Sequence, residues 1–277
     1  MTAWVTEILK DVARIEPFPR AAIRVFELVL NDADSSEVTA VLEQDPGLTT
    51  KILSVANSAK FAPSVPILSV ADATTRLGTR TLANLAMTTG CSSFFMGYGR
   101  STQRSNTTLW QECLHVALFA RHVAERSGYP NKDLAYTVGL LQNIGHIVLD
   151  RFMEEQRDEI KALSEDGVDL LTAEKTVLGM DHAQCSYRMA RKWGFPSILT
   201  RAIRAHHSPA DAADLTALCG IVNVAEGLAF ESLSDQGTSM LYPVDRETAT
   251  ICKLDTIETA DLAPIVRQEI MDTCLAG

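Results

Sequence analysis

Gly-Leu-Leu-Gln-Asn-Ile-Gly-His, residues 139–146, lies inside a longer apolar stretch at residues 134–152. Apolar side chains cover this stretch nearly all round, which predicts a central helix buried on every side rather than an amphipathic surface helix. Gly139 and Gly145 lack side chains, so neighbouring backbones can approach this helix closely. The stretch therefore predicts the centre of the fold.

Gln142 and Asn143 bring two adjacent polar side chains into that buried position. A divalent cation there would need ligands such as a neutral imidazole and a carboxylate. The two amides have similar shapes but no charge, and they are poor ligands for such an ion. Amides both donate and accept hydrogen bonds, so they can join carboxylates and imidazoles without an ion. The pair therefore predicts a buried cluster whose polar groups satisfy one another.

Apolar residues recur at helical spacing on both sides of this stretch, and no segment alternates convincingly with period two. Towards the N-terminus, helices are expected at residues 4–12, 23–30, 35–42, 46–57, 69–77 and 79–89. Towards the C-terminus, they are expected at residues 110–126, 182–193, 196–207, 215–230 and 257–275. Asp45-Pro46 and Asp181 are helix start signals, and residues 231–248 predict a mobile loop. The expected fold class is all-α.

Residues 99–108 contain no large apolar side chain and predict a boundary between two lobes. The expected organisation is a two-lobed helical bundle. An N-terminal helical lobe spans residues 1–98, an interlobe loop spans 99–108, and a second helical lobe spans 109–277 and includes the C-terminal helix.

Composition excludes several classes of protein. The 277 residues carry a formal net charge of −10, which disfavours binding to a nucleic-acid backbone. The first ten residues lack the apolar core of a signal peptide, and no apolar run approaches the roughly 18 residues that span a bilayer. We therefore expect a cytoplasmic protein without membrane contacts. The six cysteines form no CxxC pair, so we expect small buried side chains rather than a zinc site or disulfides.

The order of motifs resembles the HDOD signalling domain over roughly residues 15–230. In the N-terminal half the resemblance rests on Pro17-Phe18-Pro19, Leu42 to Leu48 (LEQDPGL), Lys51-Ile52-Leu53, Ala56-Asn57-Ser58, Ala71 to Gly78 and Leu82 to Ala86. In the second half it rests on Trp110, Ala117, Gly139-Leu140-Leu141, Ile144-Gly145, Gly179 to His182, Trp193-Gly194 and Ile203 to His207. It implies an N-terminal HDOD-type lobe followed by a lobe similar to the HD phosphohydrolases.

The resemblance also implies a degraded metal site. The first histidine of the HD enzymes falls on Glu112, their His-Asp pair on Gln142 and Asn143, and their late aspartate near Glu226. Imidazoles remain where metal-binding relatives often have them, at His182, His206 and His207. We therefore expect these seven residues to form a polar cluster or pocket, with no catalytic residue, no bound metal and no cofactor. His115 is close to the first histidine position but three residues out of register, and His122 and His146 are expected to be exposed or locally satisfied.

Three functions are compatible with such a site. The resemblance implies a non-catalytic bacterial regulatory protein that acts through contacts with a protein partner, whose identity the sequence does not give. The alternative is a metal-dependent phosphohydrolase acting on a nucleotide or cyclic dinucleotide. The carboxylate that would organise a metal pair and its water is missing, which argues against this enzyme. The third function is a sensor that binds a small nucleotide in the same place.

Overall fold

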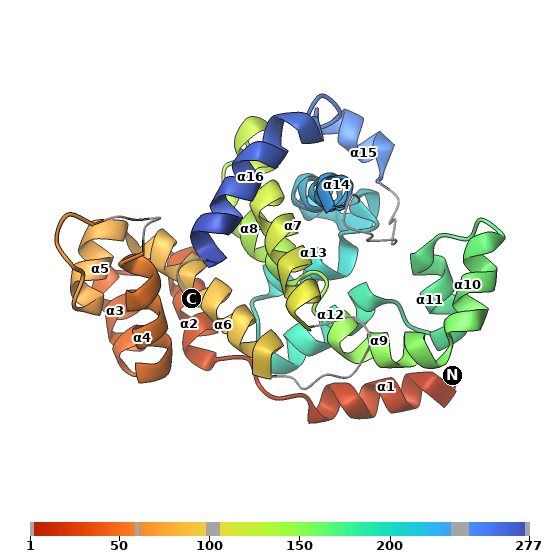
Figure 1. Cartoon of the computed structure of the whole chain (residues 1–277), viewed down its shortest axis with the longest axis horizontal. Helices are drawn as coiled ribbons and strands as arrows, with labels where there is room; N and C mark the ends of the chain where they lie inside the picture. Colours follow the sequence, from red (N-terminus) through yellow and green to blue (C-terminus); the bar gives the residue numbers. More distant parts are fainter. Residues whose placement is uncertain (1–2, 59–60, 62, 98–105, 234–243, 275–277) are drawn as a thin grey trace. The chain divides into compact units, whose positions relative to one another are not determined.

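The computed structural model describes residues 3–58, 61, 63–97, 106–233 and 244–274 (Figure 1). Every regular element in these residues is a helix, which confirms the all-α prediction. The chain divides into two compact units, one of residues 1–16 and 95–263 and the other of residues 17–94 and 264–277. This division groups residues 1–16 with the larger unit, whereas the lobes drawn from the sequence place them in the N-terminal lobe. Residues 99–105 of the expected interlobe loop (99–108) lie outside the described residues, and residues 106–108 belong to the helix Asn106–Arg126.

The smaller unit begins at the Pro17-Phe18-Pro19 motif. Its helices are α2 (Arg20–Leu30), α3 (Ser35–Glu43), α4 (Pro46–Ala56), α5 (Val70–Leu77) and most of α6 (Thr79–Gly97). Phe18 is buried, and its ring lies so close to Gly90 that a Cβ atom at position 90 would approach it to 2.8 Å. Asp45 caps α4 as predicted, because its Oδ1 accepts the Leu48 N–H at 3.0 Å.

Asn57 ends α4 and fixes the segment that leads to α5. Its Nδ2 donates to the carbonyls of Leu53 and Ile67, both at 2.8 Å, and its Oδ1 accepts the Ile67 N–H at 2.8 Å. The amide therefore pairs with both backbone groups of Ile67, whose side chain is buried. This pairing gives the Ala56-Asn57-Ser58 motif a structural role.

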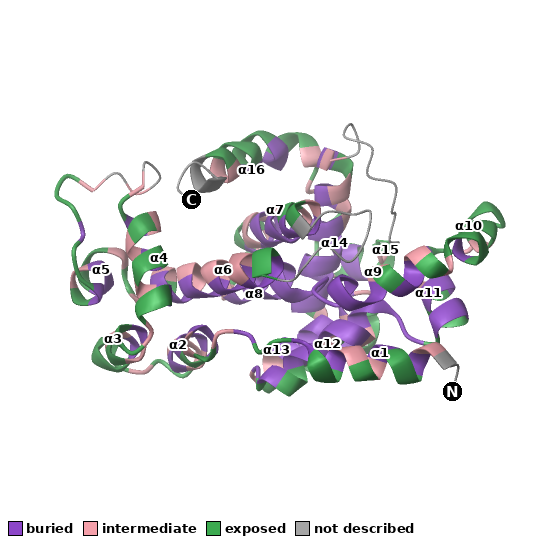
Figure 2. Ribbon diagram, turned by 60° about the horizontal axis from the view of Figure 1, so that its bottom comes forward, coloured by how far each residue is buried: buried purple, intermediate pink, exposed green. Residues whose placement is uncertain are grey.

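The larger unit holds the predicted central stretch. Its helices are α1 (Ala3–Arg14), α7 (Asn106–Arg126), α8 (Lys132–Leu141), α9 (His146–Glu155), α10 (Arg157–Glu165), α11 (Leu170–Leu178), α12 (His182–Trp193), α13 (Ser197–Ala205), the 3₁₀ helix η1 (Pro209–Leu215), α14 (Thr216–Leu233), α15 (Arg246–Ile251) and the start of α16 (Thr259–Cys274). Helices α7, α8 and α14 pack against one another. Figure 2 shows α8 as almost wholly buried. A Cβ atom at Gly139 would lie 2.9 Å from the Ala117 Cα, so only glycine permits this approach of α8 to α7.

Within the larger unit, side chains of α12 hold the C-terminal end of α1. The Lys192 ammonium donates to the carbonyls of Val12, Ala13 and Ile15 at 3.1, 2.8 and 2.9 Å. A cation satisfies the carbonyls that every helix leaves unpaired at this end. The Trp193 indole also donates to the Glu16 carbonyl at 3.0 Å. These bonds explain why residues 1–16 group with the larger unit.

The prediction of one helix over residues 134–152 is wrong at residues 142–145, where the chain turns between α8 and α9. The Gly145 N–H leaves the helical pattern and donates to Ser186 Oγ at 2.8 Å. A Cβ atom at Gly145 would lie 2.4 Å from the His182 carbonyl oxygen, so α12 packs directly on this backbone. The prediction of burial is confirmed, since residues 134–149 are all buried.

Two other expectations need correction. Residues 231–248 are not a continuous loop, because α14 extends to Leu233 and α15 begins at Arg246; residues 234–243 lie outside the described part. One helical stretch, Pro209–Leu233, is long and apolar enough to cross a membrane by composition, contrary to the expectation from the sequence. In its most apolar window, 67% of the residues are buried inside the protein, as in the core helix of a folded domain.

Candidate functional site: a buried cluster of histidines, carboxylates and amides

The cluster lies in the larger unit, where the α8–α9 turn, the start of α12, the end of α13 and the middle of α14 deliver polar side chains. The α8–α9 turn supplies Gln142 and Asn143, and α14 supplies Glu226. The α12 N-terminus supplies His182 because Asp181 caps that helix, accepting the Gln184 N–H at 2.6 Å. The last two members follow the end of α13 and are His206 and His207.

Glu226 is held by both amides through a single oxygen. Asn143 Nδ2 donates to Glu226 Oε1 at 2.7 Å, and Gln142 Nε2 donates to the same atom at 3.2 Å. The amide oxygens, Gln142 Oε1 and Asn143 Oδ1, are buried and accept no hydrogen bond from the part of the chain that the structure describes. The structure thus brings the two amides and the carboxylate into contact, and both amide oxygens are without a donor among the described residues.

Burial dominates the electrostatics of Glu226. Desolvation raises the pKa of Glu226 to about 7, although the hydrogen bond from Asn143 and the nearby His146 lower it. The charges of Glu174 and Glu112 act in the same direction as desolvation and are part of this rise. The second oxygen, Oε2, lies 3.7 Å from His207 Nε2. Ionisation of the Glu226 carboxylate therefore lowers the stability of the folded protein.

His182 is oriented by a buried carboxylate. Glu174 Oε2 lies 2.8 Å from His182 Nδ1 and also accepts the His182 backbone N–H at 2.9 Å. Both side chains are fully buried. The carboxylate assigns the ring proton to Nδ1, so His182 Nε2 presents its lone pair to His207 Nε2, 2.9 Å away.

His206 is oriented in a similar way by the backbone. Its Nδ1 lies 2.8 Å from the Ile203 carbonyl, which can only accept, so Nδ1 carries the proton. Its Nε2 is buried and has no hydrogen-bond partner among the described residues. Desolvation, with a contribution from His182, lowers the pKa of His206 to about 3. Desolvation and the two neighbouring imidazoles also hold the pKa of His207 well below its usual value.

Two members of the cluster were missed in the sequence. The His146 ring stacks on the His182 ring with centroids 4.6 Å apart and planes inclined by 13°. Its Nδ1 lies 2.9 Å from Asp150 Oδ1, so the expectation of a locally satisfied histidine holds, but its place beside His182 was not expected. The spacing of Gln142, His146 and Asp150 by four residues was an available signal. Glu174 gave no such signal, because it reaches His182 from a different helix.

Comparison with known proteins now identifies the family. Residues 15–209 match the family model of the HDOD domain. The chain belongs to the HDOD family. The resemblance seen in the sequence is thereby confirmed.

Solved structures share the HDOD fold with this chain. An HDOD domain protein from Geobacter sulfurreducens is 22% identical, with 98% of this chain and 96% of that chain covered and a TM-score of 0.74. A protein from Shewanella amazonensis SB2B, named as a proposed phosphohydrolase, is 23% identical over 96% and 95% of the two chains, with a TM-score of 0.69. A protein from Marinobacter aquaeolei VT8, named as a proposed signal transduction protein, is 25% identical over 97% of this chain and 60% of that one, with a TM-score of 0.69.

A curated relative gives no functional name. An uncharacterised protein from Treponema pallidum (strain Nichols) is 26% identical over 212 residues, which is 73% of this chain. The chain spans only 40% of the length of that relative.

Glu112, the remaining residue predicted for the degraded HDOD site, lies on α7 and is half-buried. Its negative charge acts on the cluster by raising the pKa of Glu226. His115 lies outside the cluster, and its Nδ1 bonds locally to the Gln111 carbonyl at 2.7 Å. His122 also has a local neighbour, with Nδ1 3.9 Å from Glu125 Oε2.

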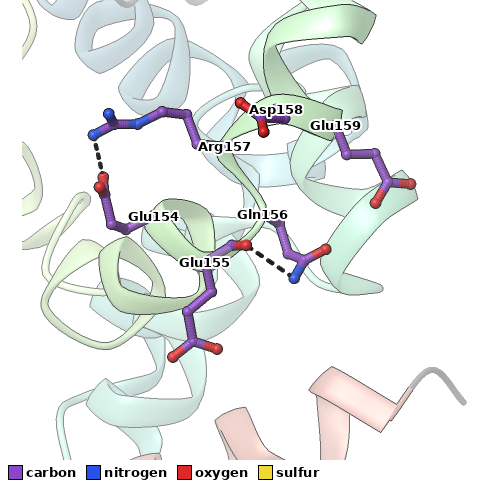
Figure 3. Close-up of a pocket in the computed structure, with 6 residues that line it drawn as sticks. All are labelled: Glu154, Glu155, Gln156, Arg157, Asp158 and Glu159. Atoms are coloured by element: carbon purple, nitrogen blue, oxygen red, sulfur yellow. Dashed lines mark hydrogen bonds and ion pairs between the residues drawn. The ribbon is translucent and has the colours of Figure 1, made fainter.

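A hollow at the turn between α9 and α10 is a separate feature. It is lined by consecutive residues, Glu154 to Glu159 (Figure 3). Glu154 pairs with Arg157, and Gln156 Nε2 donates to the Glu155 carbonyl at 3.1 Å. The lining contains no member of the histidine cluster, and its charged side chains surround one surface turn.

Proposed function

We propose that this HDOD chain is a cytoplasmic bacterial signal-transduction protein that acts through contacts with a protein partner and catalyses no phosphate-ester hydrolysis. The observation that carries the proposal is the pair of hydrogen bonds from Asn143 and Gln142 to one oxygen of Glu226. The HDOD family match and the name of the Marinobacter aquaeolei neighbour support the regulatory part.

The chemistry of the pair argues against hydrolysis. A two-metal phosphohydrolase needs a carboxylate that bridges the ions and positions a water molecule. At position 143 this chain instead has an amide, whose Nδ2 donates to Glu226 Oε1 at 2.7 Å. An N–H group repels a cation, and Glu226 Oε1 already accepts hydrogen bonds from both amides. We therefore expect the loss of nearly all the catalysis, rather than a modest loss of rate.

The test of the negative claim is a phosphodiesterase and phosphomonoesterase assay. The purified chain is stripped of metal, reloaded with Mn²⁺ or Fe²⁺, and offered cyclic dinucleotides and nucleotides. We expect no turnover above that of a His182→Ala, His206→Ala double variant. Turnover in the unmodified chain that this double variant loses would refute the proposal.

The test of the regulatory claim is cross-linking in the native cell, followed by reconstitution from purified components. A protein recovered by cross-linking must rebind the purified chain directly. Failure to find any partner that rebinds would count against the proposal. Strong thermal stabilisation of the chain by one member of a nucleotide panel would instead favour the small-ligand sensor.

A further inference from the structure

We propose that a basic face on α12 and α13 binds an acidic segment around α10 in a second copy of this chain. The basic face consists of the exposed cations of residues 182–210, and the acidic segment is residues 154–169. Both lie in the larger unit, so each copy offers both surfaces, and a two-fold dimer forms the contact twice. This inference goes beyond the proposed function and does not rest on it, because the regulatory partner can be a different protein.

The basic face carries no negative charge of its own. Residues 182–210 contain no Asp or Glu, although the whole chain has 35 acidic and 25 basic residues. Helices α12 and α13 pack against each other and lie side by side in the larger unit (Figure 2). The cations of this stretch are all exposed, and they are Arg188, Arg191, Lys192, Arg201 and Arg204.

Internal partners satisfy only part of this positive charge. Arg201 pairs with Asp214, and the Lys192 ammonium is bonded to backbone carbonyls at the end of α1. Within the described residues, the cations left without a carboxylate are Arg188, Arg191 and Arg204. An arginine can bind a carboxylate through two parallel hydrogen bonds and is less strongly hydrated than a lysine. These three side chains are therefore suited to an acidic protein surface.

The acidic segment has the opposite character. Residues 154–169 contain seven carboxylates and only two cations, Arg157 and Lys161. Each of these cations already pairs inside the segment, Arg157 with Glu154 and Lys161 with Glu165. The exposed carboxylates without an ion pair in the described part of the chain are Asp158, Glu159 and Asp166. The segment thus offers uncompensated negative charge where the basic face offers uncompensated positive charge.

Apolar side chains lie among the charges on both surfaces. Tyr187 and Ile198 are half-buried on α12 and α13, and Leu163 and Val168 are half-buried in the acidic segment. Single exposed ion pairs contribute little, so several pairs and some apolar contact are needed to hold two copies together. The repulsion between two chains of net charge −10 is screened beyond about 8 Å at physiological salt, whereas paired side chains in the interface are closer.

Analytical ultracentrifugation of the full chain tests the inference. At about 0.05 M salt the protein should form a dimer, and its dissociation constant should rise at least about tenfold at about 0.5 M salt, because ions screen exposed charge pairs. The double variant Arg188→Glu, Arg204→Glu reverses the basic face and should be a monomer. The double variant Asp158→Lys, Asp166→Lys reverses the acidic segment and should also be a monomer. An equimolar mixture of the two variants should again form a dimer, because the reversed surfaces match each other.

Matched controls change the net charge by the same amount at exposed positions outside the two surfaces, and both should remain dimers. They are Arg80→Glu with Arg246→Glu, and Glu43→Lys with Glu258→Lys. Circular dichroism checks that every variant is folded. If a double variant is unfolded, the single variants Arg188→Glu and Asp158→Lys are compared and mixed in its place.

Three results would overturn the inference: a monomer at both salt concentrations, a dimer that the reversed variants retain, or a mixture of folded variants that stays monomeric. A monomer that instead binds labelled duplex DNA or poly-glutamate through Arg188 and Arg204 would assign the basic face to another occupant and would also overturn it. Phosphodiesterase turnover and capture of a different protein play no part in these measurements, so failure here is distinct from failure of the proposed function.

Discussion

Replacing Glu226 by glutamine should stabilise the metal-free protein at alkaline pH. Burial raises the pKa of Glu226 from 4.5 to about 7 in the folded state. Below pH 4.5 the carboxyl group is protonated in both the folded and unfolded chains, and its ionisation then costs no stability. As the pH rises from 4.5 through 7, the unfolded chain ionises more readily, so the folded protein loses stability.

The size of this loss follows from the pKa difference. A shift from 4.5 to about 7 corresponds to about 3 kcal/mol at about 1.4 kcal/mol per unit. Glutamine cannot ionise, so Glu226→Gln should recover about this amount above pH 7. Its amide oxygen still accepts hydrogen bonds from Asn143 and Gln142, so the substitution mainly removes the charge.

Urea denaturation at pH 5 and pH 8, with chelator present, measures the effect. The free energy of unfolding of Glu226→Gln should exceed that of the unmodified chain by about 3 kcal/mol at pH 8 and by little at pH 5. The matched control is Glu43→Gln, which removes an exposed carboxylate from α3. Glu112, Glu174, His146 and His207 face the same site and remain unchanged in every comparison. An equal gain at both pH values, or no gain at pH 8, would refute the reasoning.

Three further substitutions test the packing around the site and one hydrogen-bonded contact inside each unit. Gly145→Ala forces a Cβ atom against the α12 backbone and should lower the free energy of unfolding by about 1–3 kcal/mol, whereas Gly97→Ala, with no atom within 4 Å of its added Cβ, should not. Asn57→Ala leaves the backbone groups of Ile67 unpaired and should cost about 1–3 kcal/mol in the same urea assay. Lys192→Met removes three hydrogen bonds to the end of α1, so hydrogen exchange of residues 3–14 should accelerate while exchange in α8 is unchanged.

Local chemistry made much of the fold predictable. Asp45 with Pro46, and Asp181 with Gly194, mark helix ends through bonds and backbone angles that involve only neighbouring residues. Such signals can be found in the sequence because both partners lie within one helical turn. The burial of residues 134–149 was equally visible, since their apolar side chains leave no polar face.

The turn at residues 142–145 and the role of Glu174 were not predictable in the same way. The turn depends on the bond from the Gly145 N–H to Ser186, and Glu174 acts on His182 across two helices. Both are contacts between elements whose packing no local pattern specifies. The resemblance to HD enzymes directed attention to inherited metal positions, and neither Glu174 nor His146 occupies one of those positions.

The amides at positions 142 and 143 change how folding and ion binding are related. A carboxylate at position 143 would lie beside Glu226, where the Asn143 donor is now 2.7 Å from Oε1. Two charges buried so close together repel strongly, so such a site requires a cation or a shared proton in order to fold. With amides, one carboxylate is stabilised by two donors, and the cluster can form without an ion. His206 Nε2 nevertheless remains available inside it. With these amides, folding of the cluster does not require the cation that a second buried carboxylate would need.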